Sequence, residues 1–263
     1  MSNTNIKTTA IVLSAGKGKR MMTDVPKQYL PLNGRPVIYY ALKAFEDSLV
    51  DDIVLVAGEE DKDFLYKEVI EKYSFNKVRK IVSGGAERYN SVYNGLCASA
   101  EDTSYVFIHD GARPLITPGM IEKLYNEVQE KKAVIAACPA KDTIKVIGED
   151  CVVTDTPDRK KLWQVQTPQV FDFLLIKEAY LKLADAGDNS VTDDAMVAEK
   201  YTDAKVYLCD TGSSNIKITT RDDLVVASAL LQNTQNPAQK TIKKQPKKMQ
   251  KSYHKMLDTN RPL

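Results

Sequence analysis

The chain has 263 residues, 43% of them apolar, which is enough to bury one large α/β core or two small ones. No run of about 18 apolar residues occurs, and the polar start MSNTNIKTT lacks the apolar centre of a secretory signal, so we expect a cytoplasmic protein without a membrane span. The four cysteines lie far apart without a C-x-x-C pair. Three of them lie in or beside apolar runs, which together with this spacing is typical of reduced, buried thiols rather than of disulfides or a zinc site.

The net charge of +2 conceals an asymmetry along the chain. Residues 234–263 contain seven Lys, one Arg and one Asp, a net of +7, which leaves −5 for residues 1–233. We therefore predict a single domain over 1–233 and a flexible, Lys-rich C-terminal tail over 234–263. The alternative is that the tail adheres weakly to nucleic acid or an anionic membrane, but we predict no specific nucleic-acid partner, because the tail has almost no interleaved aromatic residues.

Apolar runs alternate with helix-like segments through the first 140 residues. The runs predict buried strands at 9–14, 52–58, 78–84, 104–110 and 133–140. Between them, apolar residues at three- and four-residue spacing predict helices at 35–48, 62–73, 87–100 and 117–131. This order predicts an α/β fold with a Rossmann-like, mostly parallel sheet covered by helices.

The pattern changes after residue 139. The segments TIKVI and CVVTDT flank a turn at 148–150, which predicts a β-hairpin arm over 141–158 inserted into the α/β order. A projecting hairpin needs a cover for its apolar side, and a second subunit would supply one. Helices follow at 172–187 and 192–201, then a strand at 205–212 and a helix at 220–232.

Three predicted strands are followed by polar loops, with the sequences SAGKGKR, SGGAER and HDGARP. Because ligands of parallel sheets collect at the carboxyl ends of the strands, we expect these loops to form one site. The first loop and the residues after it place Lys17, Lys19, Arg20 and Lys27 close together, although neither a Walker loop nor a dinucleotide fingerprint is present. Glycines and clustered cations predict an anionic ligand.

The motifs support a more specific interpretation. LSAGKGKRM and PKQYLPLNGRPVI, followed by GGAERYNSVYNGL, FIHDGARPLI, DTIKV, DRKKLWQVQTPQVF, VTDDAMV and NIKITTRDDL, resemble the 2-C-methyl-D-erythritol 4-phosphate cytidylyltransferases in order and spacing. The resemblance covers residues 8–232. It implies a nucleotidyltransferase fold, transfer of CMP from CTP to methylerythritol phosphate in the non-mevalonate isoprenoid pathway, a Mg²⁺ or other divalent cofactor, and a homodimer with interlocked arms.

The resemblance also implies roles for individual residues. Arg20 and Lys27 would stabilise the transition state, while Arg159 and Lys217 would position the attacking phosphate. Asp110 would hold the metal ion. The residues that would contact the acceptor are Arg113, Thr143 and Thr167. The residues that would contact the nucleotide are Ser14, Ala15, Gly16, Gly18, Gly84, Gly85 and Ser91.

Simpler interpretations stay open for some of these residues. Asp110 could cap its loop, and Thr143 and Thr167 could be ordinary strand residues. Asp193 and Asp194 either cap a helix or meet the substrate. Ala86 lies where the family often has Asp, so any base selectivity at this position would come from the main chain.

Two other functions remain possible at this stage. One is a ribitol 5-phosphate cytidylyltransferase of the same fold. The other is a nucleotide-binding regulatory subunit without catalysis. The sequence holds only His109 and His254, which disfavours histidine-based chemistry.

Overall fold

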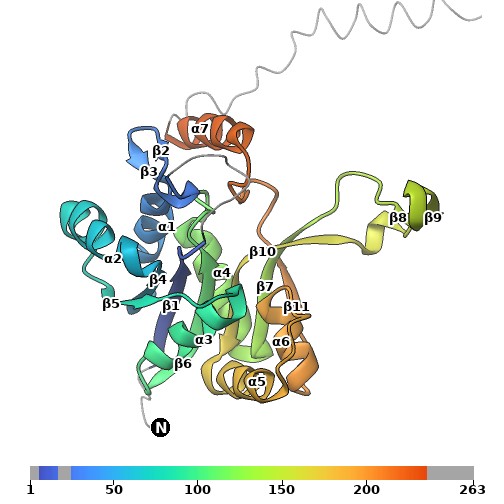
Figure 1. Cartoon of the computed structure of the whole chain (residues 1–263), viewed down its shortest axis with the longest axis horizontal. Coiled ribbons are helices and arrows are strands. Elements are labelled where there is room, and N and C mark those ends of the chain that lie inside the picture. The colour runs from blue at the N-terminus through green and yellow to red at the C-terminus, as the bar shows by residue number, and fades with distance from the viewer. Residues whose placement is uncertain (1–5, 17–24, 236–263) are drawn as a thin grey trace, which may run out of the picture.

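A seven-stranded sheet forms the centre of the computed structural model, which describes residues 6–16 and 25–235 (Figure 1). Its order is β11-β7-β10-β6-β1-β4-β5. The strands are β1 (Lys7–Leu13), β4 (Asp52–Ala57), β5 (Val78–Ser83), β6 (Thr103–Asp110), β7 (Ala133–Pro139), β10 (Trp163–Asp172) and β11 (Tyr207–Asp210). The predicted mostly parallel sheet is confirmed, because β10 alone in this sheet runs antiparallel to its neighbours.

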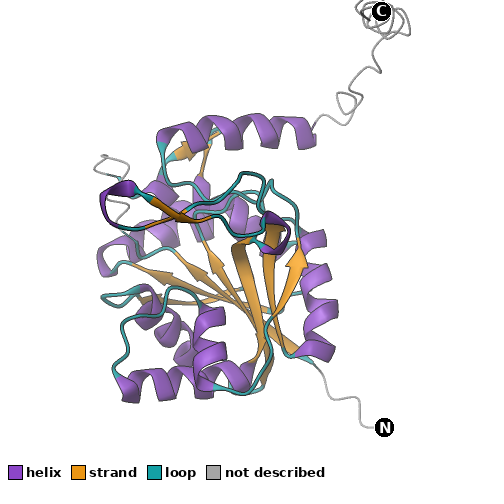
Figure 2. Ribbon diagram, turned by 90° about the vertical axis from the view of Figure 1, so that its right-hand side faces the viewer, coloured by secondary structure: helices purple, strands orange, loops and turns teal. Residues whose placement is uncertain are grey.

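Helices cover both sides of the sheet (Figure 2). One side holds α1 (Val37–Glu46), α4 (Pro118–Lys131) and the short α2 (Lys62–Phe64), which continues as the π-helix η4 (Leu65–Glu71). The other side holds α3 (Arg88–Ala98), α5 (Phe173–Ala186) and α6 (Asp194–Tyr201). Short elements complete this part of the chain: η2 (Lys27–Tyr29), β2 (Pro31–Leu32), β3 (Arg35–Pro36) and η3 (Glu59–Asp61). The last helix, α7 (Arg221–Gln235), packs against β2 in a separate small cluster.

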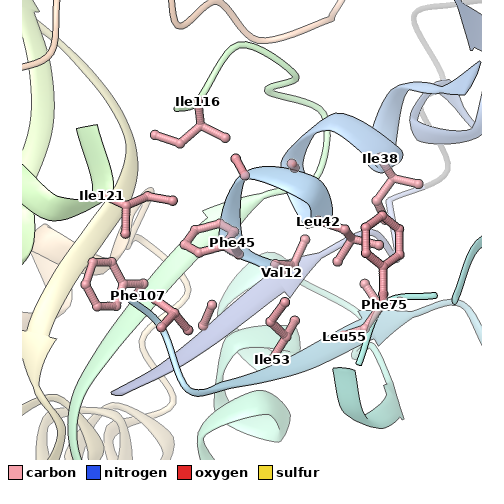
Figure 3. Close-up of a cluster of buried hydrophobic side chains, with 14 of the residues drawn as sticks. Val12, Ile38, Leu42, Phe45, Ile53, Leu55, Phe75, Phe107, Ile116 and Ile121 are labelled. Atoms are coloured by element: carbon pink, nitrogen blue, oxygen red, sulfur yellow. The ribbon is translucent and has the colours of Figure 1, made fainter. Parts of the chain in front are cut away.

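The core divides into two layers because successive strand residues face opposite sides of the sheet. In β1, Ala10 and Val12 pack with α1 and α4, whereas Ile11 packs with α3 and α5. Figure 3 shows the first layer, in which Val12 and Phe107 from the sheet lie against Phe45 from α1. The unbroken apolar runs in the sequence therefore correspond to strands that are buried on both faces.

The predicted hairpin is present as an arm that projects from the body (Figure 1). Its paired strands are short, β8 (Val146–Ile147) and β9 (Val153–Asp155), and are joined by the 3₁₀ turn η5 (Glu149–Cys151). A second 3₁₀ turn, η6 (Arg159–Lys161), leads into β10. Between 42% and 61% of the surface of each large apolar arm residue is exposed, at Ile144, Val146, Ile147, Val152 and Val153.

Three sequence-based expectations need comment. Cys138 and Cys209 are buried free thiols as expected, but Cys97 and Cys151 are exposed, so the expectation of burial was wrong for those two. Cys97 lies on the outer face of α3, and Cys151 lies in the arm turn. The predicted tail lies outside the described residues apart from the end of α7. No helix within the described ranges is long and apolar enough to cross a membrane.

Candidate active site

A cavity of about 800 Å³ opens where the loops after β1, β5 and β6 meet. Eight of the fifteen predicted site residues line it: Ser14, Ala15, Gly16, Lys27, Gly85, Ser91, Asp110 and Lys217. Gly84 lines an adjoining cavity of about 190 Å³, shared with Ala15, Gly16 and Gly85. Three loops that are distant in sequence thus form one site, as the arrangement of parallel strands predicts.

The loop after β1 is held in place by the neighbouring strand and by Gln28. The Ser14 N–H donates to the Val56 carbonyl oxygen at 2.7 Å, and the Ser14 hydroxyl donates to the same oxygen at 3.1 Å. The side-chain amide of Gln28 donates to the carbonyl oxygens of Ser14 and Gly16. Gln28 is 2% exposed and was not predicted as a site residue, although it directly follows Lys27 in the sequence.

The loop after β5 requires its glycines. A Cβ atom at Gly84 would lie 2.3 Å from the Ala15 Cβ, and one at Gly85 would lie 2.3 Å from the Asn90 Cβ. A side chain at Gly84 would push this loop away from the loop after β1, and a side chain at Gly85 would clash with the first turn of α3. The Ser91 hydroxyl accepts a hydrogen bond from the Gly85 N–H at 3.0 Å and donates to the Glu87 carbonyl oxygen at 3.2 Å. Ser91 therefore fixes the shape of this loop.

Asp110 ends β6 and is surrounded by cations. Its Oδ2 lies 2.8 Å from the Lys217 Nζ and 3.9 Å from the Arg113 Nε, and its Oδ1 lies 3.5 Å from the Arg88 Nε. Burial alone would raise the pKa of Asp110, but the charges of Arg88, Lys217 and Arg113 outweigh it and hold the pKa well below its ordinary value. Asp110 is therefore an anion at neutral pH, within a group of net positive charge.

Thr167 and His109 support Asp110 from behind the cavity. The Asp110 N–H donates to the Thr167 hydroxyl at 3.0 Å, and that hydroxyl lies 3.1 Å from the His109 Nδ1. His109 is fully buried, and burial lowers its pKa to about 4, so the ring is neutral at pH 7. Neither side chain is among the residues that line the cavity.

Arg113 and Asn215 connect this support to Lys217. Burial lowers the pKa of Arg113, whose guanidinium donates to the Asn215 carbonyl oxygen at 2.8 Å. The Asn215 side chain, fully buried, donates to the Thr167 carbonyl oxygen at 2.8 Å. These bonds hold the segment that carries Lys217 against the end of β6.

The two aspartates at the start of α6 have different roles. Asp193 caps the helix by accepting from the Met196 N–H at 2.9 Å, which confirms the capping interpretation for this residue. That interpretation was wrong for Asp194, which instead forms an ion pair with Arg88, with 2.7 Å between Arg88 Nη2 and Asp194 Oδ2. Arg88 lines the cavity but was not predicted as a site residue.

Six predicted residues are not among the residues that line the two cavities: Arg113 and Thr167 lie beside Asp110, and four others lie on the arm or outside the described chain. Thr143 and Arg159 are exposed on the arm, where the Arg159 guanidinium donates to the Lys141 carbonyl oxygen at 3.0 Å. Neither residue lines the cavity of its own chain. Arg20 and Gly18 lie outside the described residues, so their roles stay predictions.

The metal-ion prediction rests on Asp110 alone. The described residues contain no group of three or more His, Cys, Asp or Glu side chains that could hold a metal ion. Mg²⁺ commonly uses only one or two protein carboxylates and takes its other ligands from substrate phosphates and water. A single ionised carboxylate at the cavity wall fits that pattern.

Comparison with known proteins agrees with this geometry. The model of the family described as "IspD: 2-C-methyl-D-erythritol 4-phosphate cytidylyltransferase" matches residues 8–233. The chain belongs to this family. A protein of that name from Lachnoclostridium phytofermentans is 47% identical over 230 residues, covering 88% of this chain and 98% of the relative. Its namesake from Lachnospira eligens is 50% identical over 225 residues, covering 85% of this chain and 98% of the relative.

Solved structures from the cytidylyltransferase family share the fold. The 4-diphosphocytidyl-2C-methyl-D-erythritol synthase of Anaerococcus prevotii superposes with a TM-score of 0.76 at 37% identity, covering 86% of this chain and 96% of that one. The Francisella tularensis 2-C-methyl-D-erythritol 4-phosphate cytidylyltransferase gives 0.70 at 30% identity, covering 85% and 99%. The predicted fold class is thereby confirmed.

Proposed function

We propose that the chain transfers CMP from CTP to 2-C-methyl-D-erythritol 4-phosphate, giving the CDP-linked polyol and pyrophosphate for isoprenoid synthesis. The observation that carries this proposal is one cavity in which the glycine loops of a nucleotide site meet Lys27, Asp110 and Lys217. An oxygen of the acceptor phosphate attacks the α-phosphorus of CTP, and the bond from that phosphorus to the pyrophosphate leaving group breaks.

Charge repulsion is the main obstacle to this reaction. A phosphate monoester has a second pKa near 6, so the acceptor is mostly a dianion at pH 7, and joining it to CTP concentrates about six negative charges. Lys27 meets the charge that develops in the transition state, and Lys217 meets the acceptor phosphate. Fixed cations in a partly enclosed cavity stabilise such charge more strongly than water does.

A general base is unnecessary because the nucleophile is already ionised. The structure supports this reasoning at His109, which is fully buried, neutral at pH 7 and committed to hydrogen bonds. The role of the protein is therefore to position the substrates and to neutralise their charge.

Mg²⁺ would supply further neutralisation of the triphosphate when bound. Asp110 is the residue that would hold it, with oxygen atoms of the substrate completing its coordination. Lys217, 2.8 Å from Asp110 Oδ2, would then be available to the acceptor phosphate.

The arm would complete the site in a homodimer. Its apolar residues are exposed in a single chain, and a two-stranded hairpin is at best marginally stable alone. A second copy of the chain would cover them and would bring Arg159 and Thr143 to the cavity of its neighbour. This arrangement accounts for predicted acceptor residues that are distant from their own cavity.

Pyrophosphate release from CTP tests the proposal. We expect release with methylerythritol phosphate and Mg²⁺, with at least a tenfold preference in kcat/KM over ribitol 5-phosphate, and no release with CTP alone. A preference for ribitol 5-phosphate would support the related polyol enzyme. No release with either acceptor would support a regulatory nucleotide-binding protein.

A further inference from the structure

Asp194 is a buried carboxylate outside the cavity. It has no exposed surface, and its two oxygens accept hydrogen bonds from the two terminal nitrogens of Arg88, at 2.8 and 2.7 Å. The Tyr180 hydroxyl donates to Oδ1 at 2.6 Å. Residues of α3, α5 and α6 thus converge on one charge.

This arrangement needs an explanation beyond stability. The free-energy penalty of removing two charges from water offsets most of the attraction between them. Well-packed apolar residues of similar volume therefore often stabilise a core as well as a buried ion pair does, or better. The pair is also asymmetric, because 29% of the Arg88 side chain is exposed whereas Asp194 is wholly buried. Arg88 is also one of the residues that line the cavity.

The contacts fix both the position and the plane of the guanidinium. Arginine carries five N–H groups in a rigid fork. Two are directed to Asp194, and Nε is directed to Asp110 at 3.5 Å. Contacts with the described residues therefore leave one N–H group on each terminal nitrogen for oxygen atoms of a ligand.

Arg88 is also the first residue of α3, directly after the glycine loop. The capping box of Glu87 and Asn90 and the Gly85–Ser91 hydrogen bond belong to the same turn. A guanidinium held by Asp194 therefore anchors this turn to α6 and to the end of β6 together.

We propose that Asp194 is a positioning residue. It holds Arg88 at the cavity wall, where the guanidinium of Arg88 binds the anionic nucleotide and holds Asp110 in place. The inference rests on the proposed function, since it assigns CTP to this cavity. Tyr180 contributes a further hydrogen bond to the buried carboxylate of Asp194.

Asp194→Asn tests this role, because it keeps the shape of the side chain and removes its charge. The affinity for CTP, measured by titration without acceptor, should fall at least tenfold. Partial unfolding alone would reduce the number of binding sites and leave the dissociation constant unchanged. Asp193→Asn is the matched control, since Asn caps helices as well as Asp and the neighbouring charge is removed. Its CTP affinity should stay within twofold of the parent protein.

The double variant Arg88→Met/Asp194→Leu separates positioning from stability. Replacing both charges with apolar residues should give a melting temperature at or above that of Asp194→Asn, yet CTP binding should remain at least tenfold weaker than in the parent protein. Near-parental CTP affinity in Asp194→Asn or in the double variant would overturn the inference. Failure of the parent protein to bind CTP would instead refute the proposed function.

Discussion

The cavity wall and the arm differ in how they are built. Asp110 and Ser91 are 8% and 6% exposed and are held by several hydrogen bonds within the chain, whereas Ile147 and Val152 on the arm are 57% and 61% exposed. The wall follows from the parallel sheet, which gathers three loops at the carboxyl ends of its strands. The described residues of the proposed nucleotide half therefore lie in one chain, while in the proposed dimer the acceptor half depends on what covers the arm.

Lys27→Ala tests the cavity wall and should have the largest effect on activity. Lys27 is proposed to meet charge that develops in the transition state, so kcat should fall by roughly a hundredfold or more, about 3 kcal/mol, with little change in the KM for CTP. Steady-state pyrophosphate release measures both constants. Lys67→Ala, on the exposed part of η4, is the control for loss of a lysine. An unchanged kcat would remove Lys27 from the mechanism.

Lys217→Ala and Arg159→Ala compare the cavity wall with the arm, because Lys217 lines the cavity and Arg159 lies at the base of the arm, although both are proposed to bind the acceptor phosphate. Each charge-assisted contact is worth roughly 1.5–3 kcal/mol, so the KM for the acceptor should rise by about 10- to 150-fold. CTP binding, titrated without acceptor, should be spared in both variants. Equal losses of CTP affinity would contradict the division between nucleotide and acceptor residues.

Val152→Asp tests whether a second subunit covers the arm. An unpaired carboxylate in a buried apolar contact is unfavourable, so the variant should shift toward monomer in sedimentation and lose activity by about tenfold at the same protein concentration. Val225→Asp is the matched control, since Val225 is 71% exposed on α7, away from the arm. A fully active monomer would show that the arm does not complete the site.

Truncation after Gln235, the last residue of α7, should have the smallest effect. A Lys-rich segment with few large apolar residues contributes little to folding, so kcat and KM for soluble substrates should stay within about twofold. A tenfold loss of kcat/KM would mean that the tail contributes to the nucleotide half or the acceptor half of the site.

Much of the fold was predictable because its signals are local. Each unbroken apolar run proved to be a strand, and each amphipathic segment proved to be helical, with η4 the π-helical exception. Strand β10 was missed because QVQTPQVF is rich in polar residues and contains Pro168, which disfavours an interior strand. The structure accommodates this proline where the β10–β7 register shifts between Val165 and Gln169.

The site was predictable where loops carry recognisable motifs and not where it depends on distant partners. The loop of Gly84 and Gly85 and the end of β6 at Asp110 were located from the sequence alone. No local pattern could pair Arg88 with Asp194, which lie 106 positions apart. The exposure of Cys97 was not predicted, because apolar residues surround it in the sequence although it lies on the outer face of α3.

Mixing two impaired variants, assayed at an acceptor concentration below the KM of Arg159→Ala, tests most directly whether the cavity wall of one chain works with the arm of another chain. Lys27→Ala damages the wall and Arg159→Ala damages the arm, so each heterodimer of these variants would contain one doubly damaged site and one intact site. Random exchange of equal amounts makes half of the dimers heterodimers, and about a quarter of the parental activity should return when the subunits are mixed. Activity no higher than the mean of the two variants, with subunit exchange verified, would contradict shared sites.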